Sequence, residues 1–246
     1  MVDDPIVAAA RLVQGANKTI ALTGAGVSTE SGIPDFRSKG GLWSRFDPME
    51  YGTFGAFQRD PVKVWRMVAE LLAIVEARPN KGHMAMAALE EAGLLAGIIT
   101  QNIDSLHQKA GSRNVVEFHG TLASFTCLPC QAGYPLSLIK GQALPPLCPR
   151  CRAVLKPDVV FFDEEIPAAA LMRSRDLVHQ ADLLIVAGTS CAVEPAATFP
   201  ETVLAQGGKL IEINKEPVLT GKAEVVLKGG FVQMMTELAV WLQRDV

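Results

Sequence analysis

Short apolar segments alternate with longer amphipathic ones along most of the chain. The apolar segments predict buried strands over residues 18–23, 97–100, 115–118, 159–162, 183–187, 209–213 and 223–227. Helical spacing of apolar residues is clearest over residues 5–14, 61–76, 83–92, 168–180 and 231–243. This alternation is typical of a parallel sheet with helices on both faces. We therefore predict an α/β fold with a doubly wound, Rossmann-like parallel sheet, which binds ligands at the carboxyl ends of its strands.

Two stretches interrupt this alternation. Residues 38–82 are mostly helical, with connections that contain Gly and Pro, and residues 121–156 combine four cysteines with many turn formers. We expect these two stretches to form a smaller domain, as a helical module and a metal-binding module. Residues 1–37, 83–120 and 157–246 would then make up the sheet domain.

The second stretch carries two C-x-x-C pairs, Cys127 with Cys130 and Cys148 with Cys151. This spacing is typical of a zinc site with four thiolate ligands, and two disulfides are the alternative. Four protein ligands leave no open position on zinc, so the metal would be structural. We expect the fifth cysteine, Cys191, to be a buried apolar thiol.

Charge adds little to this picture. Four thiolates on one Zn²⁺ leave a negative centre, which Arg150, Arg152 and Lys156 could offset. The whole chain of 246 residues has 23 basic and 26 acidic side chains and a net charge of −3. This balance argues against a nucleic-acid binder, and we expect no direct contact with nucleic acid. No apolar run reaches the ~18 residues of a membrane span, and no secretory signal is evident, so we expect a cytoplasmic protein without membrane contact.

A glycine-rich segment follows the first predicted strand, with the sequence GAGVSTESGIPDFR over residues 24–37. Glycines let a backbone approach a phosphate closely, and a helix start would add free N–H groups. Ser28 or Thr29 would cap that helix. The segment departs from G-x-G-x-x-G because Thr29 stands where the third glycine would fall. By itself it is equally compatible with an ordinary tight turn.

Further motifs follow in a fixed order. They are residues 100–104 (TQNID), Leu106-His107, Ala110-Gly111, His119-Gly120, the two cysteine pairs, residues 157–164 (PDVVFFDE), residues 188–190 (GTS) with Val193, Pro195 and Ala196, and finally Ile213-Asn214. Together with the glycine segment they resemble the sirtuins, the NAD-dependent protein lysine deacylases, in the short prokaryotic form. The resemblance spans residues 8–240.

This resemblance implies a reaction between NAD and an acetyl-lysine protein or peptide. The acetyl oxygen attacks the ribose C1′ atom, nicotinamide leaves, and lysine and O-acetyl-ADP-ribose are finally released. His119 is implied as the base for a ribose hydroxyl, and imidazole suits this task because it titrates near neutral pH. Asn102 would orient ribose and water. From the residues alone, a lone histidine after a strand is more often structural, and only the flanking motifs favour a catalytic His119. Asn102 or Asp104 could equally be a helix cap. We interpret His107 as structural, His83 as packed at a helix start and His179 as exposed.

The resemblance also implies which residues hold the cofactor. They are Gly24, Ala25, Gly26, Thr29, Asp35, Phe36, Arg37, Gln101, Asn102, Ile103, Asp104, His119, Gly188, Thr189, Ser190, Asn214, Lys215 and Val232. Within this set, the amide of nicotinamide would be held by Asp104 and the Ile103 backbone. Phe36 would shield the reaction centre, and Arg37 would meet the phosphates.

The implied substrate segment is Val160, Phe161, Phe162 and Asp163, to which a peptide would add as an extra strand. A plain core strand is the alternative. Asp163 stands where the family pattern has glycine, and we expect its carboxylate to disfavour acidic peptides.

The resemblance also indicates which acyl group the protein removes. Family members that remove succinyl groups carry Tyr and Arg at the positions of Val68 and Leu71. We therefore expect deacetylation, with longer apolar acyl groups as an alternative, and poor desuccinylation.

The sequence bears on three other functions. A dehydrogenase would show G-x-G-x-x-G with an acidic residue at the end of the next strand, and that pattern is absent. Transfer of ADP-ribose to another nucleophile stays open as an alternative. A nucleic-acid-binding zinc ribbon finds little support in the few aromatic residues of 123–156. We expect a monomer.

Overall fold

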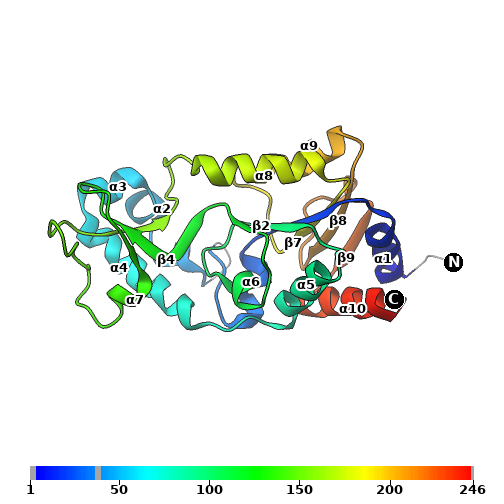
Figure 1. The fold of residues 1–246 in the computed structure, drawn as a ribbon, viewed down its shortest axis with the longest axis horizontal. Helices are drawn as coiled ribbons and strands as arrows, with labels where there is room; N and C mark the ends of the chain where they lie inside the picture. The colour runs from blue at the N-terminus through cyan, green and yellow to red at the C-terminus, as the bar shows by residue number, and fades with distance from the viewer. Residues whose placement is uncertain (1–3, 37–39, 245–246) are drawn as a thin grey trace.

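The computed structural model describes residues 4–36 and 40–244, of which Arg244 is described by its backbone alone. Within them, parallel strands form a six-stranded sheet in the order β3-β2-β1-β7-β8-β9 (Figure 1). The strands are β1 (Thr19–Thr23), β2 (Gly97–Thr100), β3 (Val115–Glu117), β7 (Leu183–Ala187), β8 (Lys209–Asn214) and β9 (Val225–Lys228). The chain runs outward from β1 on one side and outward from β7 on the other, so the predicted doubly wound sheet is confirmed.

Helices cover both faces of the sheet. Helices α1 (Pro5–Gly15), α5 (Lys81–Glu91) and α10 (Phe231–Arg244) pack on the face that carries Ala21 and Ile98. Helices α8 (Ala168–Gln180) and α9 (Phe199–Ala205) pack on the opposite face, against Ile20 and Leu22. Both faces of β1, β2 and β7 are therefore buried, which explains why these strands are mostly apolar, with threonine only at their ends.

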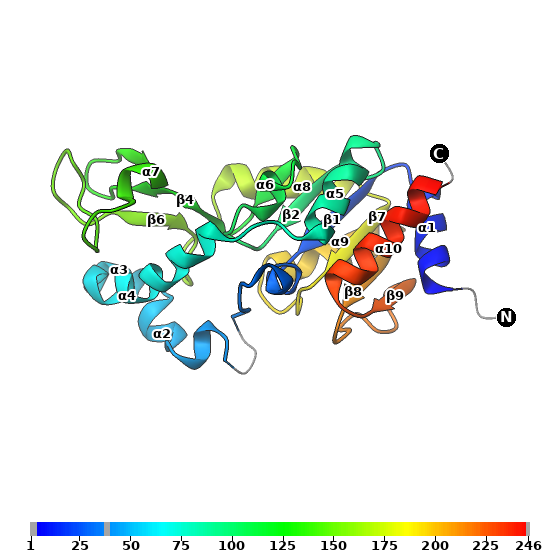
Figure 2. The ribbon, with the colours of Figure 1, turned by 90° about the horizontal axis from the view of Figure 1, so that it is seen from below.

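A smaller lobe lies at one end of the molecule (Figure 2). Its antiparallel sheet has the order β5-β4-β6, and its elements are β4 (Gly120–Thr126), β5 (Gly133–Pro135), β6 (Lys156–Val159), α2 (Pro48–Tyr51), α3 (Phe54–Arg59), α4 (Pro61–Leu71) and α7 (Leu136–Ile139). One hydrophobic cluster joins residues of α3 and α4 to residues of the antiparallel sheet. At its centre Trp65 stacks on Phe125, with ring centroids 5.8 Å apart, and donates to the Leu155 carbonyl at 2.8 Å. The domain boundaries given above stay a prediction.

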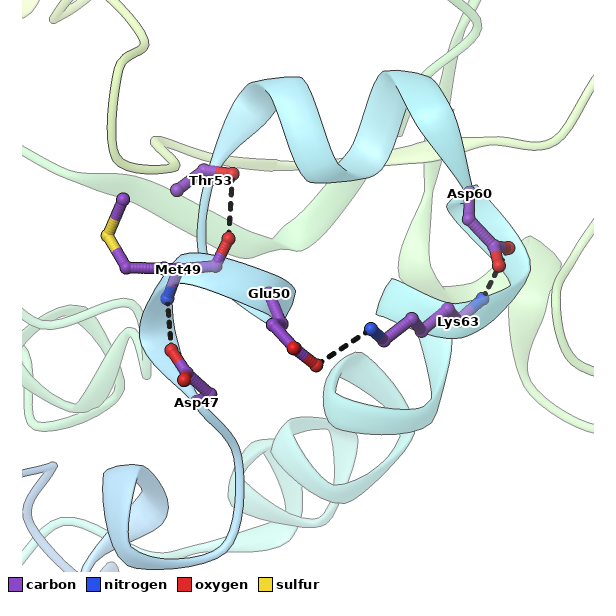
Figure 3. A network of polar contacts seen from close by, with 6 residues as sticks. All are labelled: Asp47, Met49, Glu50, Thr53, Asp60 and Lys63. Carbon is purple, nitrogen blue, oxygen red and sulfur yellow. Dashed lines mark hydrogen bonds and ion pairs between the residues drawn. The ribbon is translucent and has the colours of Figure 1, made fainter.

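The short helices of this lobe are fixed by their own caps (Figure 3). Asp47 accepts from the Met49 N–H at 2.8 Å, and Asp60 accepts from the Lys63 N–H at 2.9 Å. The Lys63 ammonium then reaches Glu50 at 2.8 Å. Side-chain caps of this kind stabilise both the four-residue helix α2 and the 11-residue helix α4 because they satisfy N–H groups that have no helical partner.

Several sequence predictions were wrong in detail. The strand expected at 159–162 lies at Lys156–Val159 and belongs to the antiparallel sheet, where it pairs with β4. The helix expected over 61–76 ends at Leu71 and continues as a 3₁₀ turn, Leu72–Glu76. Two 3₁₀ turns, Ala25–Val27 and Thr29–Ser31, replace the α-helix expected after the glycine segment. Helix α9 and strands β4 and β5 were not predicted. The remaining short helix, α6 (Leu106–Lys109), contains His107.

No helix in the described part of the chain is both long and apolar enough to cross a membrane.

Candidate active site

A cavity of about 810 Å³ opens where β1, β2, β7 and β8 end. Strands β1 and β7 lie side by side there, and their following connections diverge to opposite sides. Such a switch point leaves a crevice between the two connections, which is where open α/β sheets bind ligands. The cavity is also lined by the small lobe, through residues such as Phe161, so it lies between the two parts of the molecule.

Close contact between two loops explains the glycines at the cavity floor. The Gly26 N–H donates to the Gly188 carbonyl at 2.8 Å. A Cβ atom on Gly26 would lie 2.7 Å from the Gly188 Cα atom, and one on Gly24 would lie 2.8 Å from the Thr189 Cβ atom. Gly188 has a φ of +57° and is equally crowded. These glycines are thus required already by packing of the β1 loop on the β7 loop.

A buried polar network lies behind this floor. Asn102 donates through its side-chain amide to the Gly24 carbonyl (3.2 Å) and to Ser28 (3.1 Å). The Ser28 hydroxyl donates to Asp104 at 2.7 Å, and the other Asp104 oxygen accepts from the Leu106 N–H at 2.9 Å. Asp104 therefore satisfies the first N–H of the short helix α6 and also fixes Ser28. Ser28 does not cap a helix with its side chain, contrary to expectation, and Thr29 donates to the Gly26 carbonyl instead.

A second network joins the ends of β2, β7 and β8. Gln101 donates to the Thr189 hydroxyl at 2.9 Å. Asn214 donates to the Thr189 carbonyl at 2.9 Å. Residues from three strands are thereby held together on one rim of the cavity.

His119 lines the cavity between β3 and β4. Its Nδ1 atom lies 3.2 Å from the Gln101 carbonyl oxygen. Burial lowers the pKa of the imidazole, and the hydrogen bond to Gln101 opposes this shift without cancelling it. The ring is therefore mostly neutral at pH 7, the form that can accept a proton.

Aromatic rings form one wall of the cavity. Phe36 packs against Trp43 with ring centroids 5.6 Å apart, and Trp43 packs against Phe162 at 5.9 Å. All three line the cavity, together with Asp35. This wall connects the glycine segment to the predicted substrate segment. Arg37 lies outside the described residues.

The substrate segment follows β6. Its Val160 and Phe162 N–H groups already donate to the carbonyls of His119 and Gly52, each at 2.8 Å, and the Phe162 carbonyl accepts from Phe54. Asp163 has a φ of +63°, the left-handed conformation that Asp tolerates better than most residues. Within the described residues, the Asp163 N–H has no intrachain partner. A backbone N–H for pairing with a peptide is therefore available from Asp163 rather than from Val160 or Phe162.

Of the two positions compared for the acyl group, Leu71 lines the cavity, whereas Val68 is buried elsewhere in α4. Met67 is the second residue of α4 at the cavity. Among the described lining residues the only Lys or Arg is Lys215, which follows β8.

The four cysteines of the two pairs converge in the small lobe, with all four Sγ atoms within 4.8 Å of one another. Cys127 and Cys151 lie 3.3 Å apart, and Cys130 and Cys148 lie 3.6 Å apart. These cysteines are free, which excludes the disulfide alternative here. A ZnS₄ tetrahedron with bonds of ~2.3 Å has S–S edges of about 3.8 Å, so the cluster fits Zn²⁺.

The surroundings of the cluster differ from expectation. The Tyr134 hydroxyl lies 3.2 Å from the Cys148 sulfur. Burial raises the pKa of Cys148, but hydrogen bonds from Tyr134 and from backbone N–H groups outweigh it and lower the pKa to about 6. Lys156 does not offset the negative charge of the cluster, because its buried ammonium forms an ion pair with Glu164. Cys191 is only half buried, and it lies in the loop after β7 with a φ of +48°.

Most predicted cofactor and substrate residues line the one cavity. They are Gly24, Ala25, Gly26, Thr29, Asp35, Phe36, Gln101, Asn102, Ile103, His119, Val160, Phe161, Phe162, Asp163, Gly188, Thr189, Ser190, Asn214 and Lys215. Asp104 lies behind it, and the Val232 N–H donates to Glu30 while its neighbour Phe231 reaches the cavity. Sequence reasoning did not select Ser28, Trp43 or Phe231. Of these, only Ser28 had a signal, through its place in the glycine segment.

The structure agrees with the sequence interpretation of the three remaining histidines. His83 and His107 are buried, and His83 completes a capping box with Asn80 at the start of α5. His179 is exposed.

Comparison with known proteins identifies the family to which the chain belongs. The model of the Sir2 family matches residues 24–195. The chain belongs to the Sir2 family. Among Sir2 relatives, NAD-dependent protein deacylase 1 of Archaeoglobus fulgidus is 46% identical over 223 residues, covering 89% of this chain and 90% of the relative. NAD-dependent protein deacetylase of Thermodesulfovibrio yellowstonii is 44% identical over 209 residues, covering 83% and 82%.

Solved Sir2 structures share the fold over almost the full chain. A Sir2 homologue variant in complex with ADP-ribose superimposes with a TM-score of 0.92 at 41% identity, covering 97% of this chain and 96% of that one. A Sir2 homologue in complex with NAD gives 0.90 at 41% identity, covering 97% and 94%. A Sir2 variant with a deacetylated p53 peptide and 3′-O-acetyl-ADP-ribose gives 0.90 at 33% identity, covering 96% and 98%.

Proposed function

We propose that this protein is an NAD-dependent protein lysine deacetylase that releases nicotinamide and O-acetyl-ADP-ribose. The observation that carries the proposal is His119, a half-buried imidazole on the cavity whose Nδ1 atom lies 3.2 Å from the Gln101 carbonyl oxygen and whose pKa is lowered by burial. Membership of the Sir2 family supports the same reaction, since its named relatives are deacylases and deacetylases.

The residues at the ends of β1, β7 and β8 are suited to hold the ADP-ribose part of NAD. Backbone N–H groups near Gly24 and the hydroxyls of Thr189 and Ser190 offer donors to phosphate and ribose. Asn214 and Lys215 lie at the rim where the adenosine end would rest. Asn102 would orient ribose and water, and Asp104 would fix Ser28 and the Ile103 backbone around nicotinamide. Bound NAD supplies the ADP-ribose acceptor and the nicotinamide leaving group.

His119 would take a proton from a ribose hydroxyl through its Nε2 atom, because Nδ1 is occupied as a donor. Phe36 would close over this point and exclude water from it. A peptide would pair with the backbone at Asp163, and its lysine stem would pass between the apolar side chains of Phe161 and Phe162.

We assign one structural zinc to Cys127, Cys130, Cys148 and Cys151. The set is closed and lacks histidine, so it offers no position for water or substrate. Zinc would hold the small lobe together and take no part in the reaction.

The decisive experiment is mass spectrometry of an acetyl-lysine peptide incubated with the protein, with and without NAD. We expect loss of the acetyl group, one nicotinamide and one O-acetyl-ADP-ribose per peptide, and only with NAD. His119→Ala should lose this activity, whereas the exposed control His179→Ala should retain it. Deacetylation without NAD would overturn the proposal.

We further propose that the protein acts in the cytoplasm as a monomer. Free thiols in the zinc cluster suit a reducing compartment. The large apolar side chains exposed on the described residues come from different elements rather than from one helix or strand. Size-exclusion chromatography with light scattering would test the monomer.

A further inference from the structure

Lys156 carries a buried charge that the proposed reaction does not use. Its side chain is only 7% exposed. The ammonium lies 3.0 Å from Glu164, 2.9 Å from the Val159 carbonyl and 3.2 Å from the Pro157 carbonyl. An ammonium has three N–H donors, so these three acceptors satisfy it completely. Such a buried charge is tolerated only when paired in this way.

Glu164 connects the buried Lys156 ammonium to the backbone of the substrate segment. One of its carboxylate oxygens faces Lys156, and the other accepts from the Phe161 N–H at 3.0 Å. The Glu164 N–H in turn donates to the Phe161 carbonyl at 3.2 Å. Phe161 and Glu164 thereby close a turn that contains Asp163 in its left-handed conformation.

Two aromatic rings also lie next to the Lys156 ammonium. Its nitrogen lies 5.1 Å from the centroid of Phe161 and 5.9 Å from that of Phe54. Phe161 also stacks on Phe57 at 5.7 Å. Cations over aromatic faces are attracted to them, so Lys156 fixes the Phe161 ring as well as its backbone.

The turn held in this way lines the cavity, whereas Lys156 does not. The ammonium therefore cannot touch a ligand in the cavity, and it can act only through the shape of the turn. The pair holds the turn between Phe161 and Glu164 and the adjoining end of β6, whereas the NAD-facing loops after β1 and β7 are fixed by separate contacts.

We propose that Lys156 and Glu164 form a positioning pair that sets the geometry of the acetyl-lysine peptide groove, an inference that rests on the proposed deacetylase function. Losing the pair loosens the turn, so the peptide binds a less ordered groove. Binding of NAD and the proton transfer at His119 are unaffected.

The test compares steady-state kinetics of the full-length, zinc-loaded protein and its variants. Lys156→Met keeps the apolar stem and removes the charge. We expect KM for an acetyl-lysine peptide to rise about tenfold, equal to about 1.4 kcal/mol, while kcat and KM for NAD stay within about twofold. Lys156→Arg retains charge and donors and should recover most of the peptide KM.

Lys140→Met is the matched control, because Lys140 pairs with Glu76 in the same lobe but on its exposed surface. It should leave all three constants unchanged. Glu164→Gln is the second variant, to be measured if Lys156→Met does not fold, and it should raise the same KM.

The outcomes separate the inference from the function on which it rests. A wild-type protein that does not deacetylate the peptide with NAD would refute the function itself. A wild-type activity with unchanged peptide KM in Lys156→Met or Glu164→Gln would refute the positioning pair alone. A parallel loss in kcat and both KM values, with a lowered melting temperature, would show that the pair only maintains the fold.

Discussion

The His119 ring meets the Gln101 carbonyl oxygen at 3.2 Å through Nδ1, and this contact fixes the ring's tautomer. A carbonyl only accepts hydrogen bonds, so Nδ1 carries the proton and Nε2 keeps a free lone pair. Burial disfavours the charged ring and lowers its pKa below the ordinary 6.5. We predict that kcat/KM falls on the acid side with an apparent pKa below 6.5. Initial rates at saturating NAD between pH 5 and pH 8 would measure this limb, and a limb above 6.5 would contradict the assignment.

The acyl preference follows from the residues of α4 at the cavity. Leu71 and Met67 present no cation to an acidic acyl group, and Lys215 follows β8 on the rim assigned to adenosine. A buried carboxylate without a partner is costly. We predict that a succinyl-lysine peptide is turned over at least about a hundredfold less efficiently than its acetyl counterpart, equal to roughly 3 kcal/mol. Competition between the two peptides, followed by mass spectrometry, would show it; comparable turnover would refute the prediction.

Asp163 combines an exposed carboxylate with a left-handed backbone, and two substitutions separate these properties. Asp163→Asn removes the charge but keeps a residue that tolerates this conformation. We predict that both Asp163→Asn and Asp163→Gly improve kcat/KM for peptides with acidic residues beside the target lysine. The ratio between acidic and basic peptides is the measurement. If Asp163→Asn leaves that ratio unchanged, the carboxylate has no part in selection.

Removal of zinc should unfold the small lobe. The cysteine knuckles border β4, which carries Phe125, and the Trp65 ring stacks on Phe125 at 5.8 Å. We predict that a strong chelator shifts tryptophan emission, lowers the melting temperature and abolishes deacetylation, and that added Zn²⁺ restores all three. A chelated protein with full activity and an unchanged melting profile would disprove a structural role.

Acid should destabilise the sheet domain through two buried histidines. The rings of His83 and His107 lie 4.8 Å apart. Burial lowers the pKa of His83 to about 4, and burial together with His83 lowers that of His107 to about 3. In the unfolded chain, both histidines bind a proton with a pKa near 6.5. The two neutral rings therefore contribute fully to the free energy of unfolding above pH 6.5. This contribution is lost as the pH falls toward 4 for His83 and toward 3 for His107. The contribution is on the order of 3 to 5 kcal/mol for each histidine.

Urea unfolding at pH 7.0, 5.5 and 4.5 would measure this loss. His83→Asn should show a shallower decline with falling pH than the wild type, whereas the exposed control His179→Asn should match the wild type. Loss of zinc in acid is common to all three proteins and cancels in the comparison. Equal slopes for His83→Asn and wild type would exclude the buried pair as the cause.

The sheet could be predicted from the sequence because each of its strands is an apolar run and each covering helix an amphipathic one. Strands β4 and β5 escaped prediction because both are half-buried and set among turn formers, and β5 has only three residues. The run at 159–162 signalled burial correctly for Val159 and Phe161, but an apolar pattern does not tell which strand will be the partner.

Those residues of the candidate site that lie at the ends of predicted strands could be predicted from the sequence. Gln101, Thr189 and Asn214 each follow or end a strand, and parallel strands bring such residues to one edge. The roles of Ser28 and Lys156 were not predictable in this way. Ser28 depends on Asp104 across 76 positions, and Lys156 depends on a turn formed only in three dimensions. Local propensity made the first a helix cap, and nearness in sequence assigned the second to the charge of the zinc cluster.

Strand β1, at the centre of the parallel sheet, pairs on one side with β2 and on the other with β7, where Thr19 lies opposite Leu183. More than half of the chain separates these partners in order of synthesis. A nascent chain therefore emerges from the ribosome with its central strand half-paired, and the sheet closes only once residue 187 is available. The floor formed by Gly26 on Gly188 cannot exist before that moment, so the growing polypeptide gains its dinucleotide pocket only after the small lobe and helix α8 have been synthesised.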